Sequence, residues 1–69
     1  MKDLALLLSL FVVGQCVQIT RSVFKGQYWT VIAVNDSGTY DLKDRDWILR
    51  DVRASYLVAA EEYRCWRGK

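Results

Sequence analysis

The feature that most constrains the fold is a strand–turn–strand pattern in the middle of this 69-residue chain. Residues 28–34 are rich in aromatic and β-branched side chains, which favour a β-strand. Residues 35–38 (Asn-Asp-Ser-Gly) favour a turn, because Asn and Asp bond to their own backbone and the glycine allows a positive φ. Residues 39–43 then alternate between polar and apolar side chains. The pattern predicts a β-hairpin over residues 28–43.

Shorter strand signals flank this hairpin. Residues 16–19 alternate like a half-buried strand after Gly14, and residues 47–52 can form a further strand. Residues 53–57 are short and mixed, which suits a single 3₁₀ turn. From residue 58 onward the sequence is compatible both with a helix, because of its alanines and glutamates, and with a final strand. The chain is therefore expected to be mainly β, and its length allows only one domain.

An apolar segment precedes these strands, over residues 4–13. Three interpretations are open: a secretory signal peptide, a transmembrane helix, and a helix that packs on the rest of the fold. A membrane span needs about 20 apolar residues, and Gln15 and Gln18 interrupt the run before that length. We therefore expect an apolar helix over residues 1–12 that folds onto the strands, in a cytoplasmic protein that stays in solution without detergent. Membrane association through the segment from Leu4 to Ile19 is the alternative.

The order of these features is itself a pattern. A glycine-led first strand (residues 13–19) is followed by a loop that ends in Lys-Gly, then by the hairpin, then by a closing segment over residues 52–57. This order resembles the SH3-like small barrels of the KOW and Tudor type, over roughly Phe11 to Glu61. The resemblance implies an SH3-like barrel of about five strands over residues 13–61. Residues 62–69 are then a basic aromatic tail.

The composition excludes several classes of function. The chain has no histidine, which removes the commonest general base and metal ligand, and two cysteines cannot complete a four-ligand zinc site. The hydrophobic fraction of 52% is too high for a disordered chain, and the net charge of +2 does not establish a nucleic-acid partner by itself. We therefore expect a non-catalytic binding module, without a cofactor or a metal ion.

The two cysteines, Cys16 and Cys65, stand near opposite ends of the chain. In SH3-like barrels the first and last strands often pair, so the resemblance makes a disulfide conceivable. Such a bridge is expected only in an exported protein, because cytosolic thiols remain reduced. Two half-buried thiols are therefore the favoured interpretation.

Aromatic and basic side chains are the candidates for binding. Tudor-type domains surround methylated ammonium groups with aromatic cages, so the resemblance points to Trp29 and Trp47, although filling a small core is the favoured role for them. Around Trp66 the tail combines rings, which can stack on bases, with cations, which can neutralise phosphates. Interspersed carboxylates dilute this positive charge, and solvated surface charge is the simpler interpretation. The candidate contacts are Arg21, Lys25, Trp29, Trp47, Arg50, Arg53, Arg64, Trp66, Arg67 and Lys69.

The leading hypothesis is a small regulatory or accessory protein that contacts nucleic acid or the machinery that handles it. The alternative is a protein–protein interaction module or inhibitor, which could self-associate as a homo-oligomer through its apolar N-terminus. A third class is a membrane-tethered small protein. Nucleic-acid binding requires the basic side chains to converge on one face, whereas partner binding predicts an exposed apolar patch.

Overall fold

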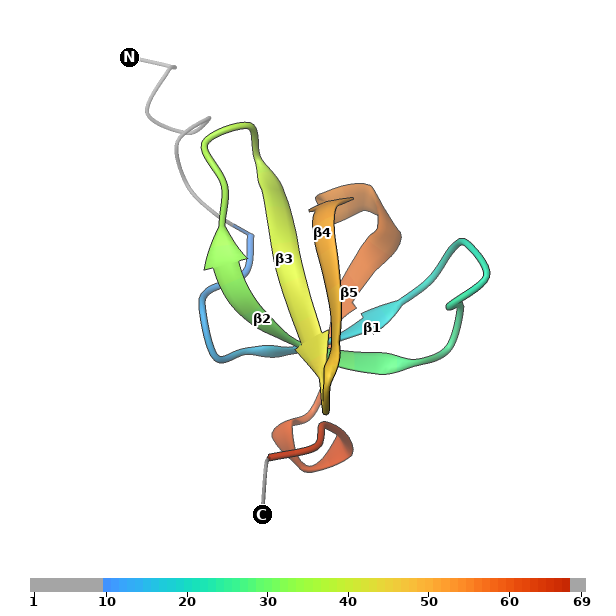
Figure 1. Cartoon of the computed structure of the whole chain (residues 1–69). Coiled ribbons are helices and arrows are strands. Elements are labelled where there is room, and N and C mark those ends of the chain that lie inside the picture. The colour runs from blue at the N-terminus through green and yellow to red at the C-terminus, as the bar shows by residue number, and fades with distance from the viewer. Residues whose placement is uncertain (1–9, 68–69) are drawn as a thin grey trace.

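The computed structural model describes residues 10–67, which form one antiparallel sheet of five strands with two short 3₁₀ turns (Figure 1). Along the sheet the strands follow the order β4-β3-β2-β1-β5. The elements are β1 (Cys16–Ile19), β2 (Tyr28–Val34), β3 (Thr39–Asp44), β4 (Trp47–Arg53), η1 (Ala54–Tyr56), β5 (Leu57–Ala59) and η2 (Glu62–Arg64). The mainly β character predicted from the sequence is confirmed.

The central hairpin has the strands and the turn that the sequence predicts. Strands β2 and β3 pair antiparallel, from Thr30 opposite Lys43 to Val34 opposite Tyr40. Within the turn, the backbone N–H of Gly38 donates to the carbonyl of Asn35 at 2.9 Å, and the φ angle of Gly38 is +88°. A residue with a β-carbon resists such a φ, so the glycine is required by the shape of the turn.

The end of the chain settles the choice that the sequence left open. Residues 54–56 form the expected 3₁₀ turn, and the chain then continues as strand β5 rather than as a helix. Strand β5 pairs antiparallel with β1, where Val17 lies opposite Ala59 and Ile19 opposite Leu57. Strand β1 also pairs with β2, so the first strand lies between the hairpin and the last strand.

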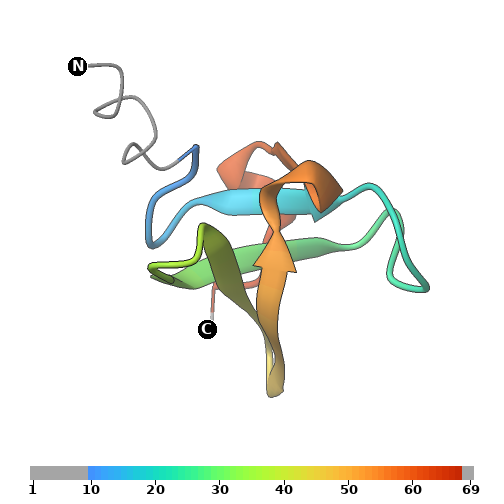
Figure 2. The ribbon, with the colours of Figure 1, turned by 90° about the horizontal axis from the view of Figure 1, so that it is seen from above.

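The sheet is strongly curved but remains open, so the prediction of a closed barrel is wrong in this respect (Figure 2). Among the strands that the structure describes, β4 pairs only with β3, and β5 pairs only with β1, which leaves these two strands at the edges. Two features of the edge strands accompany the opening. Strand β5 has three residues, and β4 contains Asp51 at a φ of +57°, a conformation that interrupts regular strand pairing.

The predicted N-terminal helix falls mostly on residues 1–9, which lie outside the described residues. Where its predicted range continues into the described part, over residues 10–12, the chain is not helical. Phe11 instead packs its ring edge-on against Tyr40, with ring centres 5.4 Å apart. The hydroxyl oxygen of Tyr40 accepts hydrogen bonds from the backbone N–H groups of Leu10 and Phe11 at 2.9 and 3.3 Å. Within residues 10–67 no helix is long and apolar enough to cross a membrane.

The core lies on the concave face of the sheet, and alternation along the strands selects its members. In β2, Trp29 and Val31 are buried, whereas Thr30 and Ile32 face the other way. Trp29 is only 3% exposed, so its predicted role in filling the core is confirmed. The same prediction is wrong for Trp47, which is 73% exposed and lies outside the core cluster. The buried cluster consists of Phe11, Val17, Ile19, Trp29, Val31, Tyr40, Leu42 and Leu57.

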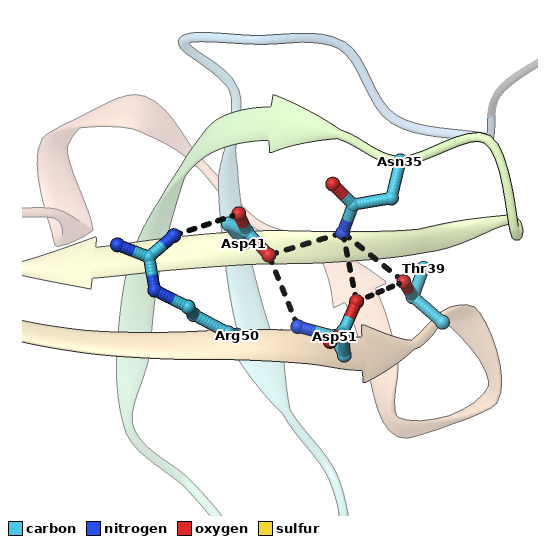
Figure 3. A network of polar contacts seen from close by, with 5 residues as sticks. All are labelled: Asn35, Thr39, Asp41, Arg50 and Asp51. Carbon is cyan, nitrogen blue, oxygen red and sulfur yellow. Dashed lines mark hydrogen bonds and ion pairs between the residues drawn. The ribbon is translucent and has the colours of Figure 1, made fainter.

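A network of polar side chains holds β3 against β4 around the buried carboxylate of Asp41 (Figure 3). Asp41 accepts hydrogen bonds from the Asn35 amide and from the backbone N–H of Asp51, both at 3.0 Å. The Arg50 guanidinium lies 3.3 Å away. The Asp51 carboxylate in turn accepts from Asn35 and from the Thr39 hydroxyl. We call these five residues the Asp41 network; its donors, Asn35 first, lower the pKa of the Asp41 carboxyl.

Candidate binding surfaces

A disulfide between Cys16 and Cys65 determines where the C-terminal segment lies. The favoured sequence interpretation, two half-buried thiols, is therefore wrong: Cys16 is fully buried, Cys65 is 6% exposed, and their α-carbons are 5.9 Å apart. The pairing of β1 with β5 brings the two cysteines toward each other. It continues past the end of β5, where the backbone N–H of Ala60 donates to the Cys16 carbonyl at 2.9 Å. The predicted tail is thus folded back beside the sheet as far as Arg67, with the η2 turn near the end of the β3–β4 hairpin (Figure 1).

The bridge places Trp66 next to the convex face of the sheet. A hollow of about 250 Å³ lies between this tryptophan and the side chains of β2 and β3 that point away from the core. We call the surface around it the tail face. The residues that line the hollow are Thr30, Ile32, Lys43, Arg45, Trp66 and Arg67.

The tail face is cationic around an exposed ring. The guanidinium of Arg45 lies 6.0 Å from the centre of the Trp66 ring, and Lys43 is exposed beside Thr30, its partner across the strands. Within the described part of the chain, neither Lys43 nor Arg45 forms an ion pair, and Arg67 has only Glu62, at 3.8 Å. The hollow is therefore lined by Lys43 and Arg45, which have no described ion pair, and by Arg67, which is paired with Glu62; no carboxylate is among its lining residues.

Arg64 belongs to an adjoining part of this surface. Its guanidinium lies 5.4 Å from the centre of the Tyr28 ring and 5.1 Å from that of Tyr63, and its Nε is 3.5 Å from a carboxylate oxygen of Glu61. The phenol of Tyr28 contributes most to raising the pKa of Arg64, followed by Tyr63 and then Glu61. Arg64 thus lies between two aromatic rings and beside a carboxylate, and less of its charge is available to a ligand than that of Lys43.

The other basic candidates lie elsewhere. Arg50 and Arg53 line a hollow of about 290 Å³ on the concave side, and Arg21 lies 5.8 Å from the centre of the Tyr56 ring. Lys25 is exposed in the β1–β2 loop, and Lys69 lies outside the described residues. We call the concave hollow the open groove. Its main lining residues are Ile19, Phe24, Leu49, Val52, Arg53 and Tyr56.

The two tryptophans proposed for an aromatic cage line a third hollow, the aromatic pocket, of about 300 Å³. Phe24 and Trp29 meet edge-to-face with ring centres 5.9 Å apart, and Trp47 is 73% exposed. Asp44 and Gln27 complete the lining. The indole N–H of Trp29 is buried and has no hydrogen-bond partner among the described residues. The pocket thus places the exposed ring of Trp47 beside Phe24, the nearly buried Trp29 and one carboxylate, a combination that can attract an organic cation.

The candidate contacts predicted from the sequence do not include Lys43 and Arg45, which line the hollow of the tail face. A signal for Lys43 was present, because the alternation that buries Leu42 turns Lys43 to the convex face, next to Thr30 in the neighbouring strand. No local signal places Arg45 beside Trp66.

Among residues 10–67, no group of three or more acidic, cysteine or histidine side chains is arranged to hold a metal ion. No family model, curated protein or solved structure matches the chain.

Proposed function

We propose that the protein is a non-catalytic binding module that contacts single-stranded nucleic acid through the tail face. The observation that carries the proposal is the hollow in which Lys43, Arg45 and Arg67 surround an exposed Trp66. Cations of this kind neutralise phosphates, and an indole offers a stacking surface to any base, so the combination suits a strand whose bases are unpaired. Contacts to phosphates position a strand without reading its sequence.

Fluorescence anisotropy with labelled oligothymidine and oligouridine tests this function. We expect Lys43→Glu combined with Arg67→Glu to abolish binding, and the affinity of the wild-type protein to fall steeply with added salt. Removing the stacking surface with Trp66→Ala is expected to cost about 1–3 kcal/mol of binding free energy. Arg21→Glu combined with Arg53→Glu is the matched control, because it makes the same change of charge on the opposite face of the sheet.

Two results would contradict the proposal. One is the absence of binding to either oligonucleotide at low salt. The other is equally tight binding to heparin with no effect of Trp66→Ala, which would show that the tail face attracts polyanions without stacking on bases. Circular dichroism of each variant shows whether a loss of binding reflects a loss of fold.

A second candidate function is recognition of a cationic group on a partner protein by the aromatic pocket. The arrangement of Phe24, Trp29 and Trp47 around Asp44 supports it, as does the resemblance to SH3-like barrels of the Tudor type, in which aromatic cages bind methylated ammonium groups. Titration with trimethyllysine, followed by tryptophan fluorescence, tests this function. Binding that Trp47→Ala removes and Trp66→Ala preserves is the expected result, whereas equal losses in both variants would contradict it.

The disulfide also bears on the compartment. Disulfides persist in oxidising compartments and are rare in the cytosol, so the Cys16–Cys65 bridge favours export over the cytoplasmic location that the sequence led us to expect. Alkylation of the protein as it is made in its own cells, followed by mass measurement, distinguishes the two. A protein that takes up no alkylating group supports export, and one that takes up two supports a cytosolic location.

A further inference from the structure

The open groove lies where the sheet fails to close, between strand β4 and the residues that follow β1. Its floor is apolar. Ile19 is buried there, and Leu49, Val52 and Tyr56 pack against the core while remaining partly exposed. An apolar hollow with a small number of polar groups at its rim is the usual form of a binding site in proteins.

The rim of the groove is cationic. Arg53 lines it, as does Arg50, which is paired with Asp41 at 3.3 Å, and Arg21 lies over the ring of Tyr56. Within the part of the chain that the structure describes, Arg21 and Arg53 form no ion pair. The one carboxylate in the lining, that of Asp51, is engaged in the Asp41 network (Figure 3). A ligand that enters the groove therefore meets positive charge around an apolar floor.

The edge of β4 adds a third element. Because β4 pairs only with β3 among residues 10–67, the backbone groups on its other edge have no partner strand in this part of the chain. Such an edge can pair with an extended segment of another protein. The positive φ of Asp51 limits regular pairing to the part of β4 that precedes it, so an added segment would be short.

We propose that the open groove binds an extended segment of a partner protein in which apolar side chains alternate with carboxylates. The apolar side chains would enter the floor beside Leu49 and Val52. The carboxylates would then point away from the floor, where the long side chains of Arg21 and Arg53 at the rim would reach them. Charge complementarity is the reason for choosing an acidic segment over a neutral or basic one. This site lies on the face of the sheet opposite the tail face, so it goes beyond the nucleic-acid function proposed above.

Three short synthetic peptides test the proposal, with leucine alternating with glutamate, glutamine or lysine. The measurement is the chemical-shift change of the backbone amides of the full-length protein, labelled with ¹⁵N, during titration. We expect the glutamate peptide to bind most tightly and to shift the amides of Ile19, Leu49 and Val52. Equal affinities for the three peptides, or shifts confined to the tail face, would overturn the proposal.

Charge reversal provides the decisive variant. Arg21→Glu combined with Arg53→Glu is expected to lower the affinity for the glutamate peptide about tenfold and to make the lysine peptide the preferred ligand. The matched control, Lys43→Glu with Arg67→Glu, should leave peptide binding unchanged while it weakens oligonucleotide binding, so failure of one function is distinguishable from failure of the other. If decanoate shifts the groove amides and no peptide does, the groove accepts a small amphiphile and the assignment to a protein segment is wrong.

Discussion

Reducing the disulfide should remove a large share of the stability of this protein. The bridge joins residues separated by 49 positions, and closing a loop of that length lowers the entropy of the unfolded chain by an amount worth about 4 kcal/mol at 25 °C. For a chain of 69 residues, a typical free energy of unfolding is roughly 3–10 kcal/mol. The reduced protein is therefore expected to be weakly folded or unfolded.

Urea denaturation with and without a phosphine reductant measures this effect. With a slope of about 1 kcal/mol per molar urea, a loss of 4 kcal/mol lowers the midpoint by about 4 M, or leaves the reduced protein unfolded without urea. Reduction is preferable to substitution as the perturbation, because it keeps both side chains. In Cys16→Ala, by contrast, loss of packing at a fully buried position would add to the loss of the bridge.

Two results would refute this reasoning. If the purified protein takes up two alkylating groups before any reductant is added, the bridge does not form. If the bridge is present but the urea midpoint is the same in both states, the loop-entropy argument fails for this chain. As a control, the reductant should not change the midpoint of the Cys16→Ala, Cys65→Ala double variant.

Three further changes test the packing and the polar network. Gly38→Val should destabilise the fold by more than about 1 kcal/mol in a thermal melt, and Gly38→Asn by less, because the open space around the residue leaves its φ of +88° as the only source of strain. Phe11→Ala should cost about 3 kcal/mol in urea denaturation, whereas the exposed Leu10 should tolerate alanine with little change. The pKa of Asp41 is lowered in the folded protein, so its stabilising effect is present above the ordinary carboxyl pKa of 3.8 and is lost as the pH falls below it. In thermal melts recorded at several pH values, Asp41→Asn should therefore lower the melting temperature at neutral pH and reduce the fall in melting temperature between neutral and acidic pH. If that fall is the same as in the wild-type protein, the result argues against the network.

The parts of the fold that could be predicted are those that local sequence determines. The turn at residues 35–38 and the β-rich run of β2 carry their own signals, and the 3₁₀ turn before β5 follows from a short mixed segment. The open sheet could not be predicted in this way. Whether β4 meets β5 depends on contacts between segments far apart in the sequence, and Asp51, which has a positive φ, donates its backbone N–H to the Asp41 carboxylate.

Asp41 shows that a side chain outside the hydrophobic core can still be buried. Simple alternation turns Asp41 away from the core because Tyr40 and Leu42 point inward, yet all three side chains are buried. The pairing of β3 with both of its neighbours shifts in register at this point, and the carboxylate accepts a hydrogen bond from the Asn35 amide. A buried carboxylate is tolerated there because three groups donate to it.

The tail face depends on the disulfide, which joins residues 49 positions apart in the sequence. The composition of the tail predicts Arg64, Trp66 and Arg67 as candidate contacts. By themselves, however, these residues form only a short cationic segment that follows two glutamates, Glu61 and Glu62. The disulfide brings that segment against the β3–β4 hairpin, where Lys43 and Arg45 add charge that no described ion pair neutralises. Binding at the tail face should therefore require the oxidised protein even under conditions in which the reduced sheet stays folded. The anchored position of Trp66, rather than the charge of the tail itself, is what the proposed function requires.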